Sequence, residues 1–340
     1  MASVPMIEVW RGDLLEGVHQ GHAVIWGEGG IEAAWGDPDR VIFPRSSCKM
    51  VQALPLIESG AADAVGLTTE HLALACASHV GAAMHTTRVA AWLEHIGLGE
   101  PDLRCGAHMP TDKAAADALT CTHEKPCQLH NNCSGKHAGF LTVTKHLKAG
   151  PEYVELDHPL QRAIRAATEE VAQEGVAGYG IDGCSAPNFA ISVTALARSM
   201  ATFAMANPEG SARERAMARL WQAMAAHPEL VAGEGRYRAD PGEGEGKACT
   251  ALMRAMGGKV AVKTGAEAVY VAILPGLKKG IALKIEDGGT RASEAAITSL
   301  LVRLGALEAG HPVVAKYLTG KQKNWRGFET GELRLAAGFA

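Results

Sequence analysis

The sequence has 340 residues, of which 47% are hydrophobic, 21% are charged and only 5% are aromatic. This balance excludes a disordered chain, because an aliphatic core of this size offsets the entropy lost on ordering. The formal net charge of −4 and the lack of a basic stripe argue against a nucleic-acid partner. A chain of this length predicts about two domains or one large α/β domain.

The chain also lacks the usual signs of a membrane or exported protein. Its longest apolar run, residues 188–206, is interrupted by Arg198, and a membrane span needs about 18 apolar residues. Residues 1–13 contain no basic region followed by an apolar stretch, so we expect no signal peptide and a cytoplasmic location. In a reducing cytoplasm the eight cysteines are expected to be thiols or metal ligands rather than disulfides.

Strands are expected at the start of the chain and helices after them. Short β-favourable runs separated by glycine-rich turns predict strands at residues 7–10, 22–26 and 31–35. From Pro44 onward apolar residues follow at helical spacing, and Pro55 inside that run predicts a kink.

The middle of the chain is predicted to be mostly helical, because its apolar residues recur at helical spacing. The expected helices cover residues 70–77, 82–95, 114–119, 139–147, 158–174, 191–205 and 212–226. Residues 239–247 are predicted to form a flexible acidic loop. Strands are then expected at residues 259–262, 268–274 and 280–286, followed by a helix at 293–304 with Ser293 as its N-cap.

Strands at both ends with helices between them predict an α/β (α+β) fold in a single domain over residues 1–340. An antiparallel sheet would come from about residues 1–45 and 257–310. The mainly helical region, about residues 46–256, would cover one side of this sheet and form a lobe.

The strongest local signal is an S-x-x-K pattern, Ser46-Ser47-Cys48-Lys49, at the start of a predicted helix. Positions i and i+3 are neighbours on a helix, so Ser46 Oγ and Lys49 Nζ are expected to meet. A neutral lysine is a base that activates a serine nucleophile. An isolated match of this kind is more often a capping serine followed by a solvated lysine.

A second signal, Lys263-Thr264-Gly265, lies at the end of a predicted strand. S-x-x-K followed by K-T-G is the pairing of the penicillin-interacting serine enzymes. Taken alone, Lys263 would be an edge-strand lysine that discourages aggregation.

Ser78, in the run Cys76-Ala77-Ser78-His79, offers a second serine for such a site. Alone it is more simply a structural residue satisfied by backbone groups. If Lys263 reaches it, however, the site holds two Ser–Lys pairs. Two neighbouring ammonium groups repel, and burial adds to this, so both effects lower the lysine pKa and supply a neutral amine.

Two glycine-broken polar runs, residues 131–137 and 181–187, carry Cys133 and Cys184. Two thiolates on separate polar loops are able to share a Zn²⁺ ion. The alternative is that both cysteines pack as small hydrophobic residues. Cys121 and Cys127 have a spacing that fits no standard zinc site, so we expect them to be structural.

Together these motifs resemble the class 3, rhizobial-type L-asparaginases of the asparaginase II family. The resemblance runs from about residue 7 to residue 310, and the Cys-Ser-Gly-Lys-His block at 133–137 is its most specific part. The segments that carry it are residues 44–49, 76–79, 132–137, 182–184, 231–237, 263–266 and 284–288. The resemblance implies a fold similar to serine β-lactamases and glutaminases, a homodimer, and hydrolysis of L-asparagine to L-aspartate and ammonia.

The resemblance also implies roles for individual residues. Ser46 would be the nucleophile, paired with Lys49, and Ser78 would pair with Lys263. One zinc ion per subunit would assist substrate binding rather than generate hydroxide. Its ligands would be Cys133, Lys136 and Cys184, and the substrate-binding residues would be Arg45, His137 and Asp182, with Asp182 reaching the zinc shell through water.

Three other functions remain open at the level of sequence. A serine β-lactamase or penicillin-binding protein shares both lysine motifs, but its substrates lie outside the cytoplasm. A glutaminase of the same fold would take a substrate with one more methylene, which a pocket distinguishes by only about 1–3 kcal/mol. A non-catalytic zinc-binding scaffold would not explain two Ser–Lys pairs.

Overall fold

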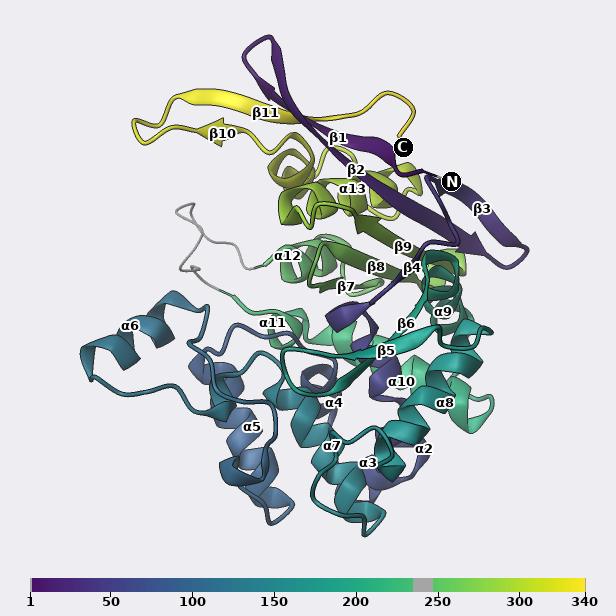
Figure 1. Cartoon of the computed structure of the whole chain (residues 1–340), viewed down its shortest axis with the longest axis vertical. Coiled ribbons are helices and arrows are strands. Elements are labelled where there is room, and N and C mark those ends of the chain that lie inside the picture. Colours follow the sequence, from purple (N-terminus) through teal and green to yellow (C-terminus); the bar gives the residue numbers. More distant parts are fainter. Residues whose placement is uncertain (1, 235–246, 340) are drawn as a thin grey trace. The chain divides into compact units, whose positions relative to one another are not determined.

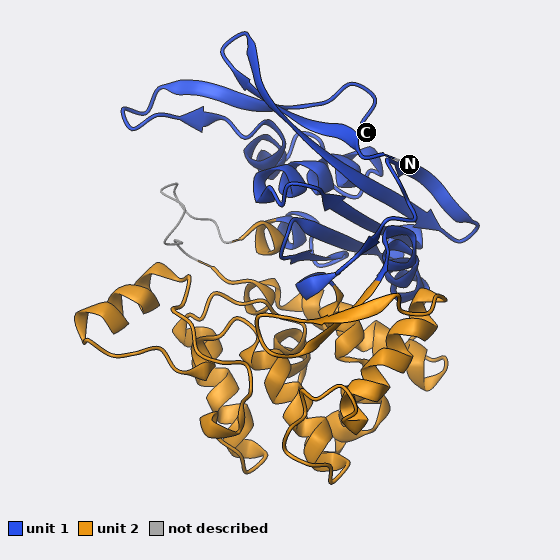
Figure 2. Ribbon diagram, in the orientation of Figure 1, with its two compact units in different colours: residues 1–47, 191–205, 252–340 blue, residues 48–190, 206–251 orange. Residues whose placement is uncertain are grey.

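The computed structural model describes residues 2–234 and 247–339, which form two compact units (Figure 2). The first unit comprises residues 1–47, 191–205 and 252–340, and the second comprises residues 48–190 and 206–251. The predicted acidic loop at 239–247 lies, except for its last residue, outside the described residues. No helix in the described ranges is both long enough and apolar enough to cross a membrane.

The first unit is built on an eight-stranded antiparallel sheet with the order β10-β11-β1-β2-β9-β8-β7, and β3 pairs with β2. Figure 1 shows N-terminal strands in purple, later strands in green and β11 in yellow within this sheet. The strands are β1 (Val4–Arg11), β2 (Leu14–Gly27), β3 (Gly30–Trp35), β7 (Ala261–Gly265), β8 (Val269–Leu274), β9 (Lys279–Ile285), β10 (Gln322–Lys323) and β11 (Glu329–Leu335). This confirms the predicted mixed fold with an antiparallel sheet made from both ends of the chain.

The centre of this sheet is covered on both faces. All six residues of β8 are buried, and successive residues of a strand point to opposite faces. Helices α9 (Val193–Met205) and α13 (Thr290–Arg303) pack against β8 and β9. At Gly280 a Cβ would lie 2.2 Å from Ala201 N, so glycine is required where β9 meets the α9 backbone. The remaining elements of this unit include β4 (Val41–Ile42), η4 (Pro275–Leu277), α14 (Pro312–Val314) and η5 (Ala315–Thr319).

The second unit is mainly helical, and its central helix is α7 (Ser134–His146). Every residue of α7 from Ser134 to Thr144 is buried. It packs against α2 (Leu54–Glu58), α3 (Ala61–Ala64), α4 (Thr69–Ala75), α5 (Ala83–His95) and α8 (Pro159–Ala172). The other elements are α1 (Lys49–Gln52), η2 (Glu100–Asp102), α6 (Lys113–Cys121), η3 (Gln128–His130), β5 (Gly178–Ile181), α10 (Ala212–Ala226) and α11 (Pro228–Val231).

The chain passes between the two units four times. Three of these crossings lie within η1 (Arg45–Cys48), β6 (Pro187–Ser192) and α12 (Ala248–Ala255), and the fourth follows the end of α9 at Met205. Residues 187–190 of β6 pair with β5, and its last two residues pair with β4. Residues 191–192 are therefore strand, and the helix predicted from 191 begins only at Val193.

Two other local predictions differ from the structure. No single helix runs through Pro55, because α1 ends at Gln52 and α2 begins at Leu54. A proline has no N–H and clashes with the preceding turn, but it is tolerated in the first turn of a helix, where it lies here. Ser293 is not an N-cap, because α13 begins at Thr290 and the Ser293 hydroxyl donates back to Thr290 O.

Candidate active site

The serine of the S-x-x-K motif lies in the tight turn η1 of the first unit. Ser46 is half-buried, and its neighbour Ser47 donates its hydroxyl to Pro44 O at 2.7 Å. Arg45 has a φ of 54°, in the left-handed region that a non-glycine residue rarely adopts. Such a conformation persists only where the surrounding structure fixes it, and it is frequent at functional sites.

The K-T-G motif lies at the end of β7, in the same unit. The side chain of Lys263 is buried and donates to Thr264 O at 2.8 Å. A Cβ on Gly265 would lie 2.5 Å from Pro44 O and 3.1 Å from Ser47 N. Glycine therefore allows the end of β7 to touch the turn that carries the S-x-x-K serine.

In the second unit, Lys49 pairs with a serine from a distant segment. Its buried Nζ lies 2.9 Å from Ser78 Oγ and also donates to Ala77 O. No sequence motif predicts this pair. The two pairs that the motifs do predict, of Ser46 with Lys49 and of Ser78 with Lys263, each join residues of different units, and they stay predictions.

A second cluster of the same unit surrounds Lys136. Its Nζ lies 3.1 Å from Cys184 Sγ, and both side chains are buried. The neighbouring Cys133 thiol lowers the pKa of Cys184 most; burial opposes this shift, and the Lys136 ammonium lowers the pKa further. The result is a pKa well below the usual value, so Cys184 is a thiolate.

The same contacts act in the opposite sense on the partners of Cys184. The proximity of Cys184 raises the pKa of the Cys133 thiol, which donates to Asn132 Oδ1 at 2.9 Å, and burial adds to this rise. Burial lowers the pKa of Lys136, but the charges of Cys184 and Cys133 outweigh it and the pKa is raised overall. Without a metal ion the cluster is therefore an ammonium–thiolate pair with an adjacent neutral thiol.

Further predicted residues lie around this pair. Burial is the main cause that lowers the pKa of His137, to about 4, so its imidazole is neutral at pH 7. The charge of Asp182 contributes to the raised pKa of Lys136. The Asp182 carboxylate accepts from Gly183 N at 2.7 Å, and Asp182 N donates to Ala186 O at 3.0 Å, which shapes the turn before Cys184.

Two more cysteines, to which the sequence motifs assign no role, belong to the same electrostatic cluster. Burial raises the pKa of Cys48 to about 11 and that of Cys105 to about 12, and the Lys136 charge opposes both shifts. Both are therefore neutral thiols. The position of Cys48 inside the S-x-x-K motif is a sequence signal that places it near the site. Nothing in the sequence around Cys105 indicates a site.

In the described part of the chain, no three side chains of the His, Cys, Asp and Glu types are grouped so as to hold a metal ion. A metal bound by Cys133 and Cys184 would therefore need Lys136 as its third protein ligand. The three side chains are mutual neighbours, and Zn²⁺ takes sulfur and nitrogen ligands such as these once the thiol and the ammonium have lost their protons.

A lysine amine next to a serine hydroxyl is a base that activates the serine to attack a carbonyl carbon. This chain is an amidohydrolase. It belongs to the L-asparaginase II family, whose family model matches residues 7–335.

Solved structures of similar fold are distant in sequence. A β-lactamase from Mycobacterium bovis is 13% identical, with a TM-score of 0.45 over 84% of this chain and 95% of that one. A class C β-lactamase is 11% identical, with a TM-score of 0.41 over 84% of this chain and 90% of that one. Mglu in its native form is 13% identical, with a TM-score of 0.46. The match covers 84% of this chain but only 64% of Mglu. No curated protein matches the sequence.

Proposed function

We propose that this protein is an L-asparaginase that hydrolyses L-asparagine to L-aspartate and ammonia through a serine nucleophile, Ser46. The observation that carries the proposal is the contact of the buried Lys49 Nζ with the half-buried Ser78 Oγ in a chain of the L-asparaginase II family. It supports the view that Lys49 handles protons at a serine rather than stabilising the surface.

In the proposed reaction Lys49, as a neutral amine, takes the Ser46 proton while Oγ bonds to the side-chain carboxamide carbon. Backbone N–H groups, including that of Ser46, stabilise the oxyanion. The C–N bond then breaks, and the leaving nitrogen takes a proton and departs as ammonia. Water attacks the β-aspartyl ester and restores the Ser46 hydroxyl. The contact of Lys49 with Ser78 offers the proton a path to a second pair, Ser78 with Lys263.

We propose Cys133, Lys136 and Cys184 as ligands of a zinc ion. When bound, zinc would supply a Lewis acid that coordinates polar groups of the substrate. Its removal should therefore change KM more than kcat. Lys136 has to lose a proton to become a ligand, so metal binding releases protons and its affinity should rise with pH. Arg45 and His137 would orient the substrate, and Asp182 would reach the zinc shell through water. The homodimer is proposed on the family resemblance alone, and the cytoplasmic location on the eight cysteines, which are expected to be reduced thiols.

The first experiment measures ammonia release from L-asparagine and from L-glutamine, with added Zn²⁺ and with a chelator. Release from asparagine that chelation weakens mainly through KM supports both the activity and the metal site. Release mainly from glutamine would instead identify a glutaminase. Without release from either amide in any metal condition, the proposal fails, and hydrolysis of nitrocefin would then point to a β-lactamase.

A pair of neighbouring serines tests the nucleophile. Ser46→Ala should abolish ammonia release and leave the fold intact, whereas Ser47→Ala loses only a hydrogen bond to Pro44 O and should stay active. Mass spectrometry after reaction with a diazoketone analogue of asparagine should find the label on Ser46. A label on Ser78, or near wild-type turnover of Ser46→Ala, would refute this assignment.

A further inference from the structure

His79 is a buried histidine that directly follows Ser78, and both of its ring nitrogens make hydrogen bonds. Nδ1 accepts from the backbone N–H of Gly81 at 3.2 Å, and Nε2 lies 2.9 Å from Ser134 Oγ. The Ser134 hydroxyl donates in turn to Leu129 O at 2.9 Å. These hydrogen bonds link the loop that carries Ser78 to the start of α7 and to η3.

The directions of these hydrogen bonds define where the proton of the ring lies. Because Nδ1 accepts from a backbone N–H, it carries no proton, so the imidazole of His79 is neutral with its N–H at Nε2. Nε2 then donates to Ser134 Oγ, whose own hydrogen points at Leu129 O. Both nitrogens are therefore occupied by these contacts, and His79 is not a base for the neighbouring Ser78.

The two loops that His79 joins also meet through their backbones. The N–H of His79 donates to Asn132 O at 3.1 Å. Gly81 has a φ of 74°, and a Cβ at this position would lie 2.8 Å from His130 O. Glycine is required for this conformation and this close approach. The histidine loop therefore contacts residues 129–134 through both side chain and backbone.

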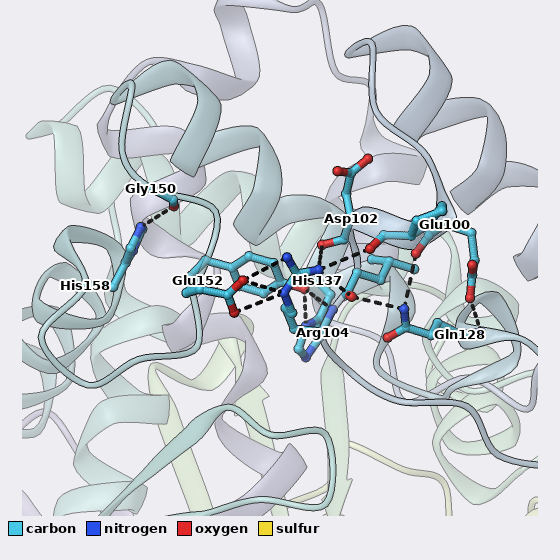
Figure 3. Close-up of polar contacts among 11 residues, drawn as sticks. Glu100, Asp102, Arg104, Gln128, His137, Gly150, Glu152 and His158 are labelled. Atoms are coloured by element: carbon cyan, nitrogen blue, oxygen red, sulfur yellow. Dashed lines mark hydrogen bonds and ion pairs between the residues drawn. The ribbon is translucent and has the colours of Figure 1, made fainter.

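The segment that receives the His79 side chain is fixed from its other side by Gln128 (Figure 3). Gln128 Nε2 donates to Leu103 O at 3.0 Å and to Glu100 O at 3.2 Å. Its backbone N–H donates to the Glu100 carboxylate at 2.8 Å, and Gly106 N donates to its Oε1 at 2.9 Å. The hydrogen bonds of His79 therefore end on a segment that is itself held in place.

We propose that His79 is a positioning residue that holds Ser78 Oγ within reach of the Lys49 amine. Lys49 Nζ lies 2.9 Å from Ser78 Oγ, and a displacement of about 1 Å between such groups costs up to about 100-fold in rate. The link from His79 to Ser134 fixes the backbone next to Ser78 and so prevents this displacement. The inference rests on the proposed function only in assigning Ser78 and Lys49 to the reaction.

Two substitutions separate the two halves of the imidazole. His79→Asn keeps an acceptor for the Gly81 N–H but is too short to reach Ser134, whereas His79→Gln reaches Ser134 with an amide N–H. We expect His79→Asn to lower kcat for L-asparagine about 10–100-fold with little change in KM, and His79→Gln to restore most of the loss. An equal loss in both variants, or a loss confined to KM, would refute the inference.

A double-mutant cycle isolates the contact with Ser134. In a Ser134→Ala background, His79→Asn should cost little further activity, because the link is already broken. Fully additive losses would contradict the proposal. If His79→Asn does not fold, Ser134→Ala breaks the same link from its other end and should lower kcat to a similar extent.

His158→Asn is the matched control, because His158 makes the same two kinds of contact elsewhere in the second unit. Its Nδ1 accepts from Leu160 N at 3.2 Å, and its Nε2 donates to Gly150 O at 2.9 Å (Figure 3). His158 is also buried. This variant should keep the native kcat. A fall as large as that of His79→Asn would show that any lost buried histidine loosens the unit, and would refute a specific role for His79.

Hydrogen–deuterium exchange tests the same role without any activity. The N–H groups of Ser78 and His79 donate to Val231 O at 2.9 Å and to Asn132 O at 3.1 Å. Both should exchange about tenfold faster or more in His79→Asn and stay protected in His79→Gln. Unchanged exchange in His79→Asn would overturn the inference. Native protein that releases no ammonia would refute the proposed function, while the exchange rates still decide whether His79 holds the loop.

Discussion

Two glycines one turn apart on the buried helix α7 should respond oppositely to the same substitution. A Cβ on Gly135 would lie 2.5 Å from the carbonyl oxygen of Leu74 and 3.0 Å from its carbon. These are backbone atoms of α4, so neither moves aside without shifting a helix. A Cβ on Gly139 would meet only side-chain atoms, at 3.4–3.6 Å, which is ordinary van der Waals contact.

The balance of two terms gives the size of each effect. Replacing glycine by alanine inside a helix gains about 1 kcal/mol. Overpacking costs about 1–3 kcal/mol, and the rigid backbone contact places Gly135→Ala near the upper end. We therefore expect Gly135→Ala to lose about 2 kcal/mol net. Gly139→Ala should be neutral or gain up to about 1 kcal/mol.

Thermal unfolding followed by circular dichroism measures both variants. For a domain of 150–250 residues, about 2 kcal/mol corresponds to a fall in Tm of roughly 4–8 °C. Gly139→Ala is the matched control, since it makes the same chemical change on the same helix. A Gly135→Ala protein as stable as Gly139→Ala would refute the reasoning, because it would mean that α7 and α4 separate without cost.

Two further predictions concern stability. Burial, and then the charges of neighbours, hold the pKa of His79 well below that of an ordinary histidine, so the unfolded chain takes up a proton that the folded protein does not. The free energy of unfolding should therefore fall as the pH drops below about 6.5. In urea titrations, His79→Asn should reduce this dependence of the free energy on pH, whereas the exposed-site control His146→Asn should not. Glu58→Gln, which breaks a half-buried ion pair with Arg213, should cost about 1.5–3 kcal/mol. Asp117→Asn, in an exposed pair, should cost less than about 0.5 kcal/mol; equal urea midpoints for the two variants would contradict this.

Elements with a strong local pattern could be predicted from the sequence. The helix expected at 212–226 is α10 with the same bounds, because a Ser211–Glu214 capping box marks its start. Strand β11, at residues 329–335, was missed. Its sequence, Glu-Thr-Gly-Glu-Leu-Arg-Leu, is largely polar and only half-buried, and its partner β1 lies at the opposite end of the chain. The periodicity of residues within one strand does not indicate which distant strand it pairs with.

The candidate site likewise contains some residues that the sequence indicated and others that it did not. Motifs indicated Cys133, Lys136 and Cys184, because each lies in a polar, glycine-broken run. The contact of Lys49 with Ser78 was not predicted, since it joins α1 to a loop that follows α4. Tertiary packing alone brings these two residues together.

The pairing of the first strand with the last also governs how the chain is made. Ile7 of β1 lies opposite Leu335 of β11, so nearly the whole chain must be synthesised before β1 gains this neighbour. The segments of the second unit, by contrast, end at residue 251 and leave the ribosome earlier. Contacts between such distant residues form slowly, and a strand that waits with an open edge is prone to aggregate. During synthesis the N-terminal strands would therefore be the part of the nascent chain that depends most on chaperones.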